Sequence, residues 1–181
     1  DLANILPRVG DGHFLAMGSS DSYILRNVTF KAVKGDKVGL DLRAPNTPIR
    51  GVQYKVGNLM KTGLPANRFS YVSCLSVIEH EVDPAAFARE CARLLRKGGL
   101  LFVTFDYWEP KIKTDIRMFG LKWDPLSMAD ALRLVQECRA QGLVPTSASD
   151  WKLGDKLIHG KNYSPHPSIG YTFGMLEFRK R

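Results

Sequence analysis

The 181-residue sequence contains only three cysteines and no apolar run that approaches the length of a membrane span. Cys74, Cys91 and Cys138 are odd in number and widely spaced among apolar residues. This pattern favours small buried hydrophobic side chains over a disulfide framework or a zinc site. The first residues also lack the basic-then-apolar pattern of a signal peptide. We therefore expect a soluble, cytoplasmic protein without a membrane span.

Acidic residues are fewer than basic ones: the sequence has 18 Asp and Glu against 26 Lys and Arg, a formal net charge of +8. Such a surplus could attract nucleic acid, anionic lipid or a phosphorylated substrate. The basic residues are spread along the chain, however, and the one tight cluster is the tail at 179–181. A solvated basic surface is the favoured interpretation, and nucleic acid is not an expected partner.

The length suits one domain with a substantial core, over residues 1–181. Within it, the stretch over 69–108 has the pattern of two buried strands joined by a helix. The apolar run 71–78 is the first strand, and Asp83 followed by Pro84 is typical of a helix start. Two glycines then predict the end of the helix and the turn into a strand over 100–105. The carboxyl ends of such parallel strands are where open α/β sheets bind ligands.

The remaining pattern extends this βαβ unit at both ends. Further strands are expected over 13–17, 37–42 and 52–56, with a helix capped by Asp21 or Ser20 after the first. After residue 108 the alternation stops, and 109–126 is interpreted as a loop or lid.

Ser127, with Asp130 three residues later, predicts a helix that ends at Gly142. Its inner face is expected to carry Met128, Leu132, Val135 and Cys138. Extended segments near 143–144 and 171–178 are expected to pair antiparallel at the edge of the sheet.

Two features suit a nucleoside ligand on physical grounds. Gly18, Ser19 and Ser20 are small residues after the first strand, and they allow a ligand to approach the backbone closely. Asp41 ends the second strand, where a carboxylate can accept hydrogen bonds from ribose hydroxyls. Asn58 follows Gly57 after the third strand, and a plain turn residue is an equal interpretation there.

The order of these strands, together with SCLSVIEH, a helix and GGLLFVTF, resembles the class I S-adenosylmethionine-dependent methyltransferases, type 11 in particular. The resemblance implies a Rossmann-like three-layer α/β sandwich around a mostly parallel seven-stranded sheet with an antiparallel C-terminal hairpin strand. It also implies S-adenosylmethionine as cofactor. Gly18, Ser19 and Ser20 would hold its methionine part, Asp41 and Leu42 its ribose, Asn58 and Leu59 its adenine, and Leu75, Ser76 and His80 the side nearest the methyl group.

His80 is the best candidate for a catalytic base by position, with a structural role as an equal alternative. For Glu79 the structural role is favoured. Metal binding by these two neighbours is not expected, because no third ligand is in view. Four aromatic residues could form a wall over the acceptor, although ordinary loop packing is the more common role of aromatic residues after a strand: Tyr107, Trp108, Phe119 and Trp123.

The sequence also departs from the family pattern. Ala16 and Ser20 stand where the family usually has an acid and a glycine, Asn58 and Ser70 replace two further acids, and Lys97 replaces a proline. The predicted function is methyl transfer to a small molecule or a sugar-containing metabolite. The acceptor could be anionic. The first rival is a catalytically silent methyltransferase-like module that binds a partner protein, with little or no N-terminal cover. The second is an RNA methyltransferase, suggested by net charge alone.

Overall fold

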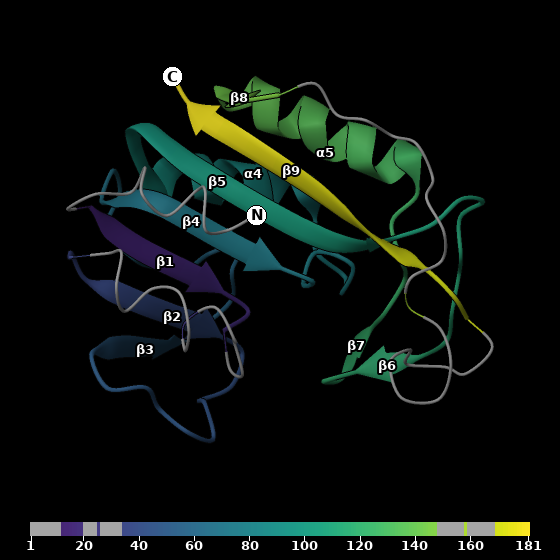
Figure 1. The fold of residues 1–181 in the computed structure, drawn as a ribbon, viewed down its shortest axis with the longest axis horizontal. Helices are drawn as coiled ribbons and strands as arrows, with labels where there is room; N and C mark the ends of the chain where they lie inside the picture. The colour runs from purple at the N-terminus through teal and green to yellow at the C-terminus, as the bar shows by residue number, and fades with distance from the viewer. Residues whose placement is uncertain (1–11, 20–24, 26–33, 148–157, 159–168) are drawn as a thin grey trace.

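The computed structural model describes residues 12–19, 25, 34–147, 158 and 169–181. Seven strands form one sheet in the order β3-β2-β1-β4-β5-β9-β8 (Figure 1). The strands are β1 (His13–Met17), β2 (Lys37–Asp41), β3 (Val52–Val56), β4 (Phe69–Leu75), β5 (Leu95–Tyr107), β8 (Leu143–Pro145) and β9 (Thr172–Lys180). The first five strands pair in parallel, and β9 pairs antiparallel with both β5 and β8. The predicted α/β fold and its antiparallel C-terminal strand pair are confirmed.

The central strands are buried because both of their faces are covered. One face of the sheet packs against α4 (Pro84–Leu94) and α5 (Met128–Ala140), which also contact each other (Figure 1). The other face carries a second cluster that includes Phe14, Tyr71 and Phe102. The helix expected after Gly18 lies outside the described residues except for Leu25, which is helical and buried in this second cluster. No helix in the described part of the chain is long and apolar enough to cross a bilayer.

Helix α4 begins where the sequence predicts and ends earlier. The Asp83 side chain accepts a hydrogen bond from the Ala86 N–H at 2.7 Å, and Pro84 is the first helical residue. The backbone is already extended at Leu95, however, so the two glycines do not end the helix. Instead, the pairing of β5 with β4 shifts between Leu95 and Leu100, and Gly98 adopts a φ of +76° in that irregular stretch. Gly98 and Gly99 therefore lie at an irregularity within β5 and not at the end of the helix.

Helix α5 has the predicted capping box, in which the Ser127 side chain and Asp130 each bond the other's backbone N–H. The predicted inner face is wrong in one position, since Leu132 is 43% exposed. Ala131, Leu134, Val135 and Cys138 are the buried residues. They follow the i, i+3, i+4, i+7 spacing, and Leu132 lies about 100° around the helix from Ala131.

The stretch predicted as a loop or lid contains a small hairpin of β6 (Arg117–Met118) and β7 (Leu121–Lys122). Its turn consists of Phe119 and Gly120, both at positive φ (57° and 86°). Two-residue turns with this backbone match the twist of paired strands, which explains why so short a hairpin forms. Figure 1 shows the hairpin set apart from the sheet, on the side toward which the arrowheads of β1, β2 and β4 point.

An ion pair between the buried Glu90 and the exposed Arg93 ties the connection between β3 and β4 to helix α4. The Glu90 carboxylate accepts hydrogen bonds from the N–H and the hydroxyl of Thr62, and Arg93 binds the same carboxylate at 2.7 Å. Arg93 also donates to the Leu64 carbonyl at 2.8 Å. These bonds add to the backbone hydrogen bonds from Asn67 and Arg68 to the end of α4.

We expect Glu90→Ala to lower the free energy of unfolding by about 2 kcal/mol, because it leaves charged and polar partners unpaired. Hydrogen bonds from Arg93 hold the pKa of Glu90 at about 2, below its ordinary value. The stabilisation therefore requires the ionised carboxylate and is lost as pH falls from about 4 through that pKa. Urea unfolding at pH 7 and pH 3 measures it. Arg89→Ala, at the exposed neighbouring position, is the control; an equal loss there would contradict the role of Glu90.

Candidate functional site

A cavity of about 520 Å³ opens at the carboxyl ends of β1, β2, β3 and β4. Its lining brings together residues that are far apart in the sequence, from the first strand turn to the β6–β7 hairpin. Eight of the ten predicted site residues line it: Gly18, Asp41, Leu42, Asn58, Leu59, Leu75, Ser76 and His80. Ser19 is buried next to the cavity without lining it, and Ser20 lies outside the described residues.

The first turn approaches its neighbours as closely as the sequence suggests. The Gly18 N–H donates a hydrogen bond to the Leu40 carbonyl at 2.8 Å, which ties the end of β1 to β2. Gly18 has a φ of +69°, and an added Cβ would lie 2.2 Å from the nearest methyl carbon of Val77. Only glycine fits this position. Ala16, two residues earlier, also lines the cavity, so a methyl group stands where the family usually places a carboxylate.

Asp41 and Asn58 end neighbouring strands at the same edge. One Asp41 carboxylate oxygen accepts a hydrogen bond from the Arg43 N–H at 3.2 Å, which orients the side chain at the cavity. The Asn58 side-chain oxygen accepts from the Met60 N–H at 2.8 Å, and the Asn58 carbonyl accepts from the Lys61 N–H at 3.0 Å. Asn58 is therefore a turn residue as well as a cavity residue, so the two interpretations are compatible.

His80 lies at the far side of the cavity, in the loop after β4. The residue is 9% exposed, and its Nδ1 has no hydrogen-bond partner among the described residues. Burial lowers the pKa of His80 below its ordinary value, so the imidazole is neutral at physiological pH. The Phe119 ring stands edge-on to the imidazole at 6.3 Å. A neutral ring with an unpaired nitrogen can accept a proton from a bound molecule.

Glu79 faces away from this cavity. Its side chain is 3% exposed, and its Oε1 accepts a hydrogen bond from the Asp106 N–H at 3.2 Å, next to the end of β5. The two neighbours therefore lie in different environments: His80 lines the larger cavity, and Glu79 is buried beside Asp106. Within the described ranges, no group of three or more His, Cys, Asp or Glu residues could hold a metal ion.

The four aromatic residues after β5 separate in the structure. Phe119 lines the cavity at the hairpin turn and is 65% exposed. Trp123 is fully buried, and its indole N–H donates to the Asp106 carboxylate at 2.8 Å. Tyr107 is buried in the core, and Trp108 is outside the cavity lining. Of the four, Phe119 alone lines the cavity, and Tyr107 and Trp123 are buried packing residues.

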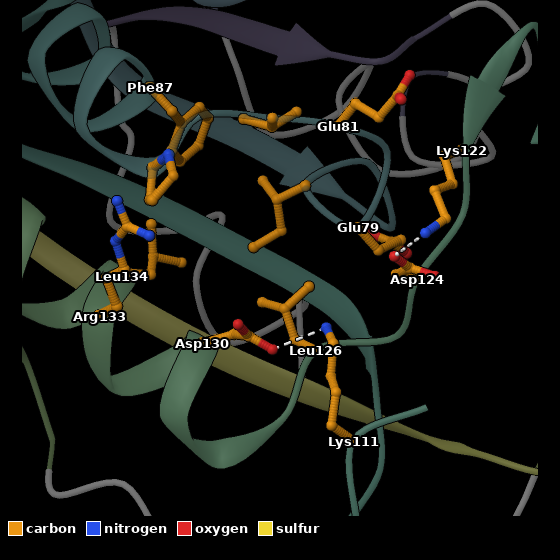
Figure 2. Close-up of a pocket in the computed structure, with 13 residues that line it drawn as sticks. Glu79, Glu81, Phe87, Lys111, Lys122, Asp124, Leu126, Asp130, Arg133 and Leu134 are labelled. Carbon is orange, nitrogen blue, oxygen red and sulfur yellow. Dashed lines mark hydrogen bonds and ion pairs between the residues drawn. The ribbon is translucent and has the colours of Figure 1, made fainter. Parts of the chain in front are cut away.

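A second cavity of about 260 Å³ lies behind the loop after β4, between this loop, α4, α5 and the segment around β7 (Figure 2). Two ion pairs cross its rim, from Lys111 to Asp130 at 2.8 Å and from Lys122 to Asp124 at 3.1 Å. Glu81 and Val82 line both cavities. The loop after β4 is therefore the partition between them.

The sequence did not indicate Arg43, Val77 or Leu121 as site residues. Arg43 lines the cavity and donates to the Phe119 carbonyl at 3.2 Å, so it links the β2 side of the cavity to the hairpin. The signal that could have found it was the Asp-x-Arg spacing at the end of β2. Leu121 depends on how the hairpin folds over the site, which no local pattern encodes.

Comparisons with known proteins agree with this geometry. Residues 16–103 match the methyltransferase domain family. The chain is 28% identical over 112 residues to the ubiquinone biosynthesis O-methyltransferase of Sodalis glossinidius, covering 60% of this chain and 43% of that protein. The chain thus spans less than half the length of this curated relative.

Two solved structures have the same fold. An S-adenosylmethionine-dependent methyltransferase from Mesorhizobium loti superposes with a TM-score of 0.66 at 14% identity, covering 98% of this chain and 94% of that one. Phosphoethanolamine N-methyltransferase 2 of Haemonchus contortus, in complex with S-adenosyl-L-methionine, gives 0.59 at 15% identity, covering 78% and 35%. The predicted resemblance to S-adenosylmethionine-dependent methyltransferases is confirmed. S-adenosyl-L-methionine is the ligand bound in the Haemonchus structure.

The close contact at Gly18 leads to a testable expectation. Gly18→Ala should destabilise the protein by more than about 2 kcal/mol, since it adds a clash to the cost of about 1–2 kcal/mol for a left-handed backbone. Thermal unfolding of Gly98→Ala provides the matched control, because Gly98 also has a positive φ but open space around its Cβ. Equal losses in the two variants would show that the contact with Val77 is unimportant.

Proposed function

We propose that this protein is a methyltransferase that transfers the methyl group of S-adenosylmethionine to a small-molecule acceptor. The observation that carries the proposal is the convergence of eight separately predicted residues on one cavity at the carboxyl ends of the strands. The match to the methyltransferase domain family over residues 16–103 supports it. We further propose that residues 1–181 act as a single domain.

The cavity offers the groups that the cofactor requires. Gly18 lines the cavity without a side chain, so a ligand can lie against the backbone of the first turn. The Asp41 carboxylate is placed to accept hydrogen bonds from ribose hydroxyls. Leu42 lies on the ribose side with Asp41; Asn58 and Leu59 provide surface for the adenine, and Leu75 and Ser76 line the side toward His80. When bound, S-adenosylmethionine supplies a methyl group on a sulfonium, which is transferred to a nucleophile.

His80 would act as the base in this proposal. Methyl transfer needs alignment of the nucleophile with the methyl carbon, and removal of a proton when the acceptor is a hydroxyl. The lowered pKa of His80 leaves one of its two ring nitrogens without a proton at neutral pH, and the residue lines the cavity. The name of the Sodalis relative favours an acceptor oxygen as the site of methylation. A small hydroxylated metabolite, including a sugar-containing or anionic one, fits this chemistry.

One specific observation favours a silent, partner-binding module as the alternative. Ala16 places a methyl group on the cavity wall where a carboxylate would help to receive the ammonium of the cofactor. Thermal shift assays with S-adenosylmethionine and S-adenosylhomocysteine, on wild type and on Ala16→Asp, separate the two functions. A ligand that binds the native state must raise Tm. If neither ligand stabilises either protein, the silent module is the better description.

For the cofactor site, we expect Asp41→Ala to weaken the binding of S-adenosylmethionine by at least about tenfold, the usual effect of losing hydrogen bonds to a charged group. Isothermal titration calorimetry measures the affinity. Asp115→Ala is the control, because Asp115 is exposed and lies outside both cavities. Unchanged affinity in Asp41→Ala would remove the ribose contact from the proposal.

For the base, we expect His80→Gln to lower kcat by about 10²–10⁴-fold with an acceptor that must lose a proton, the range for general base catalysis. Affinity for the cofactor, measured by calorimetry, should change less than about threefold. The wild-type rate should fall below the lowered pKa of His80, because protonation removes the base. A His80→Gln variant with normal kcat would assign His80 a packing role beside Phe119.

A further inference from the structure

The base of the β6–β7 hairpin is attached to the sheet at a buried pair of carboxyl groups. Glu79 follows β4 and Asp106 lies near the end of β5, and they are 3% and 6% exposed. The Glu79 Oε1 accepts from the Asp106 N–H at 3.2 Å, and Asp106 accepts from the Trp123 indole at 2.8 Å. The two residues thus contact each other and the segment that follows the hairpin.

Backbone hydrogen bonds reinforce the same junction. The Glu79 carbonyl accepts from the Asp124 N–H at 3.1 Å, and the Asp106 carbonyl accepts from the Leu126 N–H at 2.8 Å. The segment 123–126 is therefore bound to both strand ends. The direction in which the hairpin leaves the sheet depends on this junction.

One oxygen of the pair has no donor. The Glu79 Oε2 is buried and has no hydrogen-bond partner among the described residues. An ionised carboxylate in that position would be costly, because a buried charge without a donor is not solvated. A proton on Glu79 removes that charge, and the neighbouring Asp106, whose N–H already binds Glu79 Oε1, raises the pKa of Glu79 further.

The hairpin connects the pair to the proposed active site. Its turn residue Phe119 stands beside His80, and Arg43 holds the Phe119 carbonyl from the opposite wall of the cavity. The junction and the turn are the two ends of one short segment. A change in the junction therefore changes how Phe119 covers the cavity.

We propose that Glu79 and Asp106 are positioning residues: with one shared proton they hold the hairpin closed over the active site, and loss of this proton to solvent releases the hairpin. The closed hairpin places Phe119 over His80 and over the cavity mouth. This inference rests on the proposed function only for its consequence in catalysis, because closure itself is a property of the chain.

The charged groups around the pair are consistent with this role. Burial raises the pKa of Glu79 well above its ordinary value, with Asp106 adding to the effect, and it raises the pKa of Asp106 to about 6. Cys74 on β4 and Tyr171 before β9 have raised pKa values and stay uncharged. Figure 2 shows Lys122, Asp124 and Glu79 pointing toward one another, but Lys122 is paired with Asp124 at 3.1 Å. His80, the next residue, is neutral.

The sign of the pH dependence follows from these raised values. A carboxyl group that keeps its proton longer in the folded state stabilises that state at low pH, and this stabilisation is lost as pH rises. Asp106 ionises at about 6, which leaves the pair with one proton, and the junction should weaken as pH rises further toward the raised pKa of Glu79. Glu79→Gln replaces the shared proton by an amide N–H, so the junction should no longer respond to pH.

Hydrogen exchange measured by mass spectrometry tests the proposal on the whole chain without ligand. In wild type we expect the protection factors of amides 117–124, corrected for intrinsic rates, to fall at least about tenfold between pH 5.5 and pH 8, and Glu79→Gln should keep the protection of pH 5.5 at both values. Its Tm at pH 8 should exceed that of wild type by about 3 °C, with no difference at pH 5. Asp115→Asn, an exposed acid in the same segment, should behave as wild type.

Two results would overturn the inference: protection in wild type that does not depend on pH, or an unchanged dependence in Glu79→Gln. Asp106→Asn is the second variant in case Glu79→Gln does not fold, since an Asn oxygen can still accept from Trp123. Calorimetry with S-adenosylhomocysteine at pH 5.5 distinguishes the two proposals. Absence of binding there ends the methyltransferase function, whereas the exchange data would still decide the role of the carboxyl pair.

Discussion

The hydrogen bond from the Gly18 N–H to the Leu40 carbonyl is the contact on which the site depends. It exists because Gly18 takes a backbone conformation that other residues rarely adopt, with its Cα facing Val77. Through it, the turn after β1 stays close to the end of β2, and the loop after β4 packs directly against both. A wider turn would fill the cavity or separate Asp41 from the residues after β4.

The sheet and most of its strand ends were predictable because their determinants are local. Asp83 with Pro84 and Ser127 with Asp130 encode helix starts within four residues, and the buried strands are continuous apolar runs. Parallel pairing then brings the ends of β1, β2, β3 and β4 to one edge without further information. This is why Asp41, Asn58 and His80 could be assigned to one cavity before any distance was known.

The parts that sequence reasoning missed depend on contacts between distant segments. The glycines at 98 and 99 suit a helix end and a kinked strand equally, and only the pairing with β4 selects the second. Leu132 is apolar, yet α5 packs on the sheet through the neighbouring face, which carries Ala131, Leu134, Val135 and Cys138. Leu121 reaches the cavity because the hairpin folds back over it, and Trp123, just after the hairpin, is bound to Asp106.

The side chains of Glu79 and His80, which follow β4, lie on opposite sides of one loop. Consecutive side chains on an irregular backbone diverge, and here Ser76 and Glu81, both at positive φ, bound the loop that separates the two cavities. His80 faces the larger cavity with an unpaired nitrogen, whereas Glu79 is buried against Asp106 with an unpaired oxygen. Burial acts on both in the same sense, favouring the neutral form of each side chain.

The same physical effect therefore has opposite consequences for proton chemistry on the two sides of the loop. On the His80 side, the neutral imidazole can take a proton from a methyl acceptor bound in the cavity. On the Glu79 side, neutrality means that a proton is retained, and it completes the hydrogen bonding of the junction that carries the hairpin. A charged residue at either position would disturb the other, because they are adjacent in a loop with little access to water. The Ala16 methyl group likewise adds no charge to the wall of the larger cavity.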